Sequence, residues 1–244
     1  MIISAKHKFL FVSNPRCAST SMRIALHPYA DLIDLFEKTE NQNQVNHHSS
    51  CYQIKKAFNY AFDQERQETG EEPKGLPFDQ YYIFGTIRNP FKKLVSWYFF
   101  NRPDSNFKFF YEEGYDPDTA FSNHFNEFID HLANNVQKSL PHYEFMFVDW
   151  ETNQQIAHDI FKVEELNEIF PSKFKEKTGL DIPHVHNLIL KEEGGKKQVR
   201  ISEDAPDNVK FTGNPYDLYN DNSINYVEQN FSTDLSKFNY EFGQ

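Results

Sequence analysis

The chain is poor in cysteine and lacks any long apolar run. Only Cys17 and Cys51 stand among the 244 residues, too few for a disulfide framework or a zinc site. No apolar stretch approaches the ~20 residues that a membrane-spanning helix needs, and the first residues lack the apolar core of a signal peptide. We therefore expect a reduced, cytoplasmic protein with no metal and no association with a membrane.

Acidic residues are missing from two particular stretches, although the chain as a whole is acidic. The formal net charge of −11 argues against general binding to nucleic acid. Residues 1–30 and 86–102 contain no Asp or Glu and carry +4 each, so the rest of the chain carries −19. Positive potential kept in two stretches of an acidic chain favours a small polyanionic ligand. A solvated basic face is the alternative for either stretch alone.

Apolar and aromatic residues are frequent enough for a packed core. Hydrophobic residues make up 39% of the chain and aromatic residues 16%, which argues against disorder. The length suits a single domain over residues 1–244. Residues 31–47, 67–77 and 191–200 are polar, charged or rich in glycine and are expected to form surface loops.

The first informative stretch lies near the start of the chain. Phe9–Val12 predicts a buried strand, Asn14-Pro15 a turn, and Ser19–Leu26 a helix that opens on hydroxyl side chains. A strand, a turn and a helix start in this order present backbone N–H groups and a helix N-terminus to an anion. Arg16 lies in the turn and adds a charged donor.

A second stretch repeats this order. The apolar residues 81–87 predict a strand that ends at Arg88, and Pro90 suits the first turn of a following helix. Ser96 follows Arg88 by eight residues. Two such turns, each with an arginine and a hydroxyl, are what a ligand with two separate phosphate-like groups requires.

The remaining patterns complete an α/β arrangement. Strands and helices alternate in the first half of the chain, which favours a mainly parallel sheet. The further elements expected are a serine-capped helix over 51–58, a helix over 120–136, paired strands 145–148 and 159–163 around a turn at 151–155, a helix from 164 to about 178, a flexible basic loop at 194–197, and a last helix that opens at Asn214-Pro215.

Nucleoside triphosphate chemistry has a different signature. A kinase of the P-loop type carries Gly-x4-Gly-Lys-Ser/Thr and an aspartate that holds magnesium. The first loop has neither glycine nor lysine, and Asp149 falls where a hairpin turn is expected. The residues therefore favour an anion transfer that needs no magnesium.

Three segments resemble the sulfotransferases that use 3′-phosphoadenosine 5′-phosphosulfate (PAPS), especially the carbohydrate sulfotransferases and their bacterial relatives. Residues 14–21 resemble the 5′-phosphosulfate loop of that family, and residues 87–96 resemble its 3′-phosphate motif. Residues 48–55 resemble the segment that holds its catalytic base. Weaker likeness at 163–166, 182–184 and 239–242 extends the resemblance over nearly the whole chain.

The resemblance implies a P-loop-like three-layer fold, with a central, mainly parallel sheet flanked by helices, and a soluble PAPS-dependent sulfotransferase. Its acceptor would be a carbohydrate or another small hydroxylated molecule. The resemblance further implies that His48 of this chain is the general base and that Arg88 and Ser96 hold the 3′-phosphate. The 5′-phosphosulfate would be bound by Arg16, Cys17, Ala18, Ser19, Thr20 and Ser21.

One position departs from the family pattern, and other interpretations stay open. The family commonly has lysine where Arg16 stands; arginine keeps the charge but does not give up its proton, so it can stabilise a leaving phosphate without acting as an acid. His47 is an alternative to His48 as the base. A PAPS-binding protein without catalysis, and a metal-dependent kinase of small molecules, are the alternative functions.

Overall fold

The computed structural model divides the chain into two compact units, Met1–Ile87 with Tyr143–Glu203 and Arg88–His142 with Asp204–Gln244, here called the first and the second unit. The single-domain organisation expected from the length stays a prediction. The residues that the structure describes are 1–31, 48–70, 76–100, 121–134, 141–182, 185, 188–193, 196–201 and 214–244.

The first unit is built on a four-stranded sheet. Its strands lie in the order β1 (Ile2–Ser4), β2 (Phe9–Val12), β3 (Tyr82–Ile87) and β4 (Asp159–Lys162). β1 is antiparallel to β2, whereas β2, β3 and β4 are mutually parallel neighbours. All four residues of β2 are buried, as expected for a strand covered on both faces. The predicted mainly parallel sheet is confirmed.

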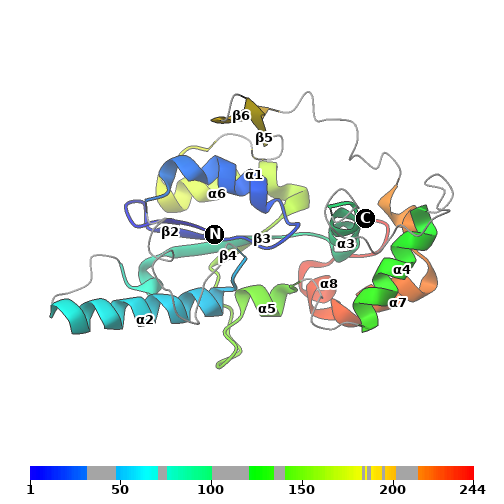
Figure 1. Cartoon of the computed structure of the whole chain (residues 1–244), viewed down its shortest axis with the longest axis horizontal. Helices are drawn as coiled ribbons and strands as arrows, with labels where there is room; N and C mark the ends of the chain where they lie inside the picture. Colours follow the sequence, from blue (N-terminus) through cyan, green and yellow to red (C-terminus); the bar gives the residue numbers. More distant parts are fainter. Residues whose placement is uncertain are drawn as a thin grey trace. The chain divides into compact units, whose positions relative to one another are not determined.

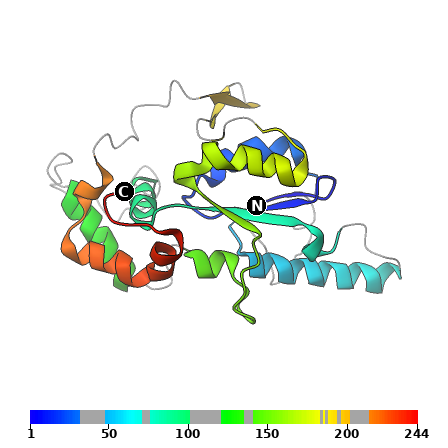
Figure 2. The same ribbon diagram turned by 180° about the vertical axis from the view of Figure 1, so that it is seen from behind.

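Helices cover both faces of this sheet (Figures 1 and 2). One face carries α1 (Ser19–Leu26) and α6 (Leu166–Thr178), and the other carries α2 (Cys51–Thr69) and α5 (Tyr143–Phe147). The three-layer α/β fold is therefore confirmed. The core on the α1 and α6 face is mainly aromatic and includes Phe9, Phe11, Met22, Leu26, Phe84, Phe161, Phe170 and Phe174.

The opposite face depends on a close approach at Gly85 in β3. A Cβ atom at this position would lie 2.2 Å from Cε1 of Phe147 and 3.3 Å from the carbonyl oxygen of Val12. The absence of a side chain lets the ring of Phe147 in α5 rest directly on the strand. Further along the same layer, Phe58 of α2 packs edge-on against Tyr81 with ring centroids 5.5 Å apart.

The second unit is helical in its described part. It contains α3 (Pro90–Phe100), α4 (Phe121–Asn134), the 3-10 helix η8 (Pro215–Leu218), α7 (Asp221–Asn230) and α8 (Ser232–Phe238). Its core joins α3, α4 and α7 through Phe91, Leu94, Tyr98, Phe125, Ile129, Val227 and Phe231. Short 3-10 turns elsewhere are η1 (His27–Tyr29), η2 (Phe78–Gln80) and η6 (Val163–Glu165).

The expected hairpin of residues 145–148 with 159–163 is wrong. Residues 143–147 form α5, and Val148 makes only an isolated bridge with Gln155. β4 pairs with β3 instead. A short apolar run fits a strand or a buried helix equally well, and the helix buries Tyr143, Met146 and Phe147 on one side.

The expected loop boundaries also need correction. α2 continues to Thr69 and ends at Gly70, whose φ of 69° is a left-handed helix cap. The predicted loop at 191–200 overlaps an antiparallel pair of strands, β5 (Leu188–Glu193) and β6 (Lys196–Ile201). A Gly-Gly pair between two runs is a hairpin signal that the sequence reasoning passed over. Residues 32–47 and 71–75 lie outside the described residues.

The last helix is broken in two where one was expected. Asn214-Pro215 opens the short η8, and a new helix, α7, starts after Asn220. The side chain of Asn220 accepts from the N–H of Ser223, whose hydroxyl lies 2.9 Å from the N–H of Asn220. This reciprocal capping box restarts the helix.

Candidate functional site

The segment that joins β2 to α1 has an unusual backbone. Arg16 and Ala18 both adopt left-handed conformations, with φ of 61° and 56°. Such values are uncommon for residues other than glycine. Left-handed residues within a tight loop turn successive N–H groups toward one side, which is the geometry of an anion-binding nest. We call residues 13–18, between the end of β2 and the start of α1, the anion loop.

The N-terminus of α1 continues this arrangement. No side chain caps the helix at Ala18, and its first turn contains no acidic residue. The N–H of Met22 donates to the carbonyl of Ala18 at 3.0 Å, so Ser19, Thr20 and Ser21 precede the first intrahelical donor. Their N–H groups have no acceptor within the helix, and the helix dipole adds positive potential there.

His48 is linked to the anion loop by a hydrogen bond. Its Nδ1 lies 3.0 Å from the carbonyl oxygen of Ser13. A carbonyl only accepts, so Nδ1 must carry the proton, and in the neutral ring the lone pair is on Nε2. Burial lowers the pKa of His48, and the charges of Arg23 and Arg16 lower it further against the opposing effect of the Ser13 bond. The ring is therefore neutral and basic at Nε2 near pH 7.

The chain that follows His48 is fixed by the start of α2. Ser50 caps this helix, and its Oγ accepts from the N–H of Gln53 at 3.2 Å. The side chain of Gln53 accepts in return from the N–H of Ser50 at 2.9 Å. The expected serine cap is confirmed, and it holds the backbone two residues after His48. His47, the alternative base, lies outside the described residues.

The second arginine motif belongs to the second unit. Arg88 directly follows β3 and is half-buried, and Ser96 is half-buried on α3. Asn89 opens this helix, because its Oδ1 accepts from the N–H of Phe91 at 3.0 Å. Its amide group donates to the carbonyl of Glu241 at 3.2 Å. The predicted order of strand, arginine, Asn-Pro and helix is confirmed, while the ligand roles of Arg88 and Ser96 stay predictions.

Asp149, the aspartate considered above as a magnesium ligand, stabilises the turn that it begins. One carboxylate oxygen lies 2.7 Å from Nζ of Lys55, and the other accepts from the N–H groups of Glu151 and Thr152. The Lys55 bond is the main cause that lowers the pKa of Asp149 to about 2. Among the described residues, no group of three or more His, Cys, Asp or Glu side chains is placed to hold a metal ion.

The sequence reasoning missed one residue that contacts the anion loop. The hydroxyl of Thr86 in β3 donates to the carbonyl of Cys17 at 2.5 Å. The side chain of Asn14 donates to the carbonyl of Thr86 at 3.2 Å. These partners are 69 and 72 residues apart, so no local pattern could have revealed them.

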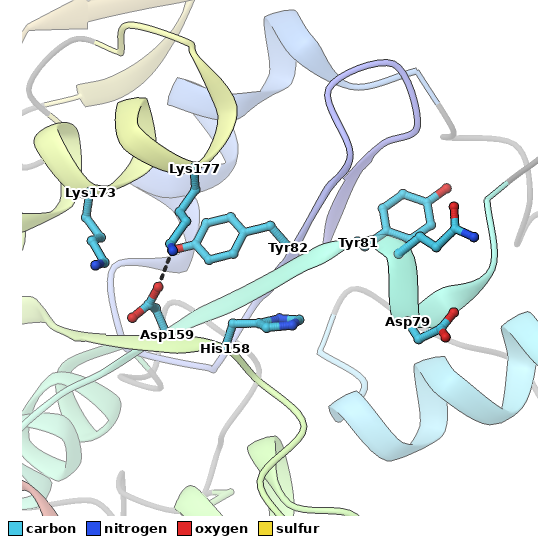
Figure 3. A pocket seen from close by; sticks show the side chains of 8 residues that line it. Asp79, Tyr81, Tyr82, His158, Asp159, Lys173 and Lys177 are labelled. Carbon is cyan, nitrogen blue, oxygen red and sulfur yellow. Dashed lines mark hydrogen bonds between the residues drawn. The ribbon is translucent and has the colours of Figure 1, made fainter.

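A cavity of about 480 Å³ lies elsewhere in the first unit, at the amino ends of β3 and β4. Lys173 and Lys177 extend from α6 toward it, and the hydroxyl of Tyr82 donates to Asp159 at 2.8 Å (Figure 3). Ligands of open α/β sheets bind at the carboxyl ends of the strands, which is where the anion loop follows β2. We therefore take the anion loop, with α1 and His48, as the candidate site.

A loop with two left-handed residues, a helix N-terminus and a neutral histidine thus lie together at the carboxyl end of a strand in a three-layer α/β sheet. The sequence model of the sulfotransferase family matches residues 1–241 of the chain. The chain belongs to the sulfotransferase family, as its motifs predicted. No curated protein and no solved structure matches it. In the described part of the chain, no helix has the length and apolarity needed to cross a bilayer.

Proposed function

We propose that the protein transfers a sulfuryl group from PAPS to the hydroxyl of a carbohydrate or another small hydroxylated acceptor. The observation that carries this proposal is the hydrogen bond from Nδ1 of His48 to the carbonyl of Ser13. It gives a member of the sulfotransferase family a neutral imidazole, basic at Nε2, that is attached to an anion loop.

The residues of the first unit fit the 5′-phosphosulfate of this donor. The N–H groups of residues 18–20 and the hydroxyls of Ser19, Thr20 and Ser21 would surround the anion, and Arg16 would supply the charge. The N–H of Cys17, expected in the same role, donates instead to the carbonyl of Asn14 at 3.2 Å. Residues 1–30 contain no carboxylate to oppose it. In the second unit, Arg88 and Ser96 would hold the 3′-phosphate, the arginine through its forked donors.

In the proposed step, PAPS supplies the sulfuryl group and 3′-phosphoadenosine 5′-phosphate leaves. Nε2 of His48 accepts the proton of the acceptor hydroxyl. The acceptor oxygen bonds to sulfur as the sulfur–oxygen bond to the 5′-phosphate breaks, and the electron pair stays on that phosphate. Arg16 stabilises the charge without giving up a proton. Positioning and electrostatics would then supply most of the rate.

Two alternatives make different demands on the same residues. A non-catalytic PAPS-binding protein would need Arg88 and Ser96 but no base, so the fixed tautomer of His48 favours an enzyme. A metal-dependent kinase would need a carboxylate for magnesium, and Asp149 is bonded to Lys55 and two backbone groups. Cys17 and Cys51 are buried thiols, which favours a cytoplasmic setting.

The decisive experiment compares His48→Ala with the wild-type protein. Transfer from sulfur-labelled PAPS is measured on a panel of sugars and phenols, and the affinity for 3′-phosphoadenosine 5′-phosphate is measured by calorimetry. Loss of a general base lowers the rate about 10²–10⁴-fold, whereas the affinity should change less than about threefold.

The matched control is His27→Ala, because His27 is exposed at the end of α1. It should transfer sulfuryl groups at the wild-type rate. Near-normal transfer by His48→Ala would reject His48 as the base. No transfer by the wild type, with normal nucleotide binding, would favour the non-catalytic alternative.

A further inference from the structure

Thr86 is a buried residue of β3 that bonds to two positions of the anion loop. Its hydroxyl donates to the carbonyl of Cys17 at 2.5 Å, and its own carbonyl accepts from the side chain of Asn14 at 3.2 Å. Thr86, Asn14 and Cys17 each have 0% exposed surface. Loss of a hydrogen bond between such buried groups destabilises the folded state, because a buried polar group without a partner is not solvated by water either.

The position of the Cys17 bond explains what it can do. Cys17 lies between Arg16 and Ala18, the two residues with left-handed backbones. Strained conformations of this kind persist only where the surrounding structure enforces them. The bond from Thr86 fixes the peptide between the two strained residues, while the bond from Asn14 fixes the start of the loop.

We propose that Thr86 is a positioning residue, which holds the anion loop in its binding conformation before the ligand arrives. The loop can then present the N–H groups of residues 18–20 without first losing the free energy needed to order them. The identity of the anion as the 5′-phosphosulfate of PAPS rests on the proposed function, whereas the role of Thr86 in shaping the loop does not.

Two substitutions distinguish the effect of the Thr86 hydroxyl from the effect of the size and branching of its side chain. Thr86→Val keeps the branched side chain and removes the donor to Cys17, and Thr86→Ser keeps the donor and removes the methyl group. Amide hydrogen exchange is measured on each variant without any ligand. We expect exchange in residues 16–21 to be at least tenfold faster in Thr86→Val, and within threefold of the wild type in Thr86→Ser.

Binding provides a readout that a purely structural role would not reproduce. Thr86→Val should weaken the affinity for 3′-phosphoadenosine 5′-phosphate about tenfold, and Thr86→Ser less than threefold. Glycine adopts the φ of 56° found at Ala18 without strain. Adding Ala18→Gly to Thr86→Val should therefore restore most of the lost affinity, whereas it would not repair a weakened sheet.

The outcomes distinguish this proposal from the proposed function. Equal exchange of residues 16–21 in Thr86→Val and Thr86→Ser would overturn the role of Thr86, whatever the ligand is. Faster exchange in Thr86→Val alone would support it, even if the wild type failed to bind 3′-phosphoadenosine 5′-phosphate and the donor assignment fell. If Thr86→Val does not fold, Asn14→Ala removes the second bond without altering β3 and is judged by the same exchange comparison with the wild type.

Discussion

At the scale of single residues, His48 has the clearest electrostatic consequence. Burial, with the nearby charges of Arg23 and Arg16, lowers its pKa below the ordinary value of 6.5. The ring, as the proposed base, is therefore neutral above pH 6.5, and the rate should fall only as the pH drops through the lowered pKa. The unfolded chain takes up this proton first, so protonation also reduces stability below pH 6.5.

This consequence can be measured directly by nuclear magnetic resonance. The imidazole signal of His48, assigned by its absence in His48→Gln, should titrate with a midpoint below 6.5. The acidic limb of kcat/KM for sulfuryl transfer should follow the same midpoint. A midpoint at or above 6.5 would contradict the inferred environment of the ring.

Arg88 allows a test of ligand recognition at the same scale. Arg88→Ala should weaken binding of 3′-phosphoadenosine 5′-phosphate about 10–100-fold, because a charge-assisted, forked contact to the 3′-phosphate is lost. Binding of adenosine 5′-phosphate, which has a 3′-hydroxyl, should change less than threefold. Calorimetry with both nucleotides measures the difference, and equal losses would mean that Arg88 does not contact that phosphate. Exposed Arg66, near the end of α2, offers the matched control, Arg66→Ala.

At the scale of the elements, the start of α2 connects helix stability with the proposed base, His48. Ser50→Ala removes the capping oxygen that accepts from Gln53 and should cost about 1 kcal/mol, or roughly 2–4 °C in Tm for a chain of this size. The backbone two residues after His48 would loosen, so transfer should slow about tenfold with nucleotide affinity unchanged. Ser50→Thr keeps a capping hydroxyl at this buried position and should retain both properties. A normal rate in a measurably destabilised Ser50→Ala would separate the cap from the base.

Elements whose signals are local were predictable from the sequence. The β2–α1 turn, the Ser50 cap and the β3–α3 turn each combine an apolar run with a residue that marks a helix start. The prediction of a strand at 145–148 was wrong because this apolar run is too short to show a helical or a strand period. The prediction of one continuous last helix was wrong because the break at Asn220 depends on a capping box with Ser223. The apolar spacing does not reveal this capping box.

The shape of the candidate site was less predictable than its composition. Arg16 and the hydroxyls of α1 were visible as an anion-binding pattern. The left-handed backbones of Arg16 and Ala18 were not, because neither residue is glycine or asparagine. Thr86, which donates to the carbonyl of Cys17 between them, is distant in the sequence and carries no motif of its own. Geometry set by tertiary contacts is what local patterns omit.

At the scale of the whole molecule, charge and family membership point the same way. Residues 1–30 and 86–102 carry +4 each in a chain of net charge −11, and each stretch holds one of the two arginine motifs. An acidic protein that keeps these stretches free of carboxylates is suited to a small polyanion. Membership of the sulfotransferase family over residues 1–241 makes a phosphosulfate the natural form of that polyanion.

The same whole-molecule view predicts how the activity responds to metal chelation. Arg16 and the start of α1 supply positive charge to the proposed phosphosulfate site, and Asp149 is engaged by Lys55. Transfer from labelled PAPS in excess EDTA should therefore stay within twofold of the untreated rate, and added magnesium should not raise it. A metal-dependent kinase would instead lose its activity with the chelator and regain it with magnesium. Such a loss and recovery, together with phosphoryl transfer from a nucleoside triphosphate, would reject sulfuryl transfer in favour of the kinase.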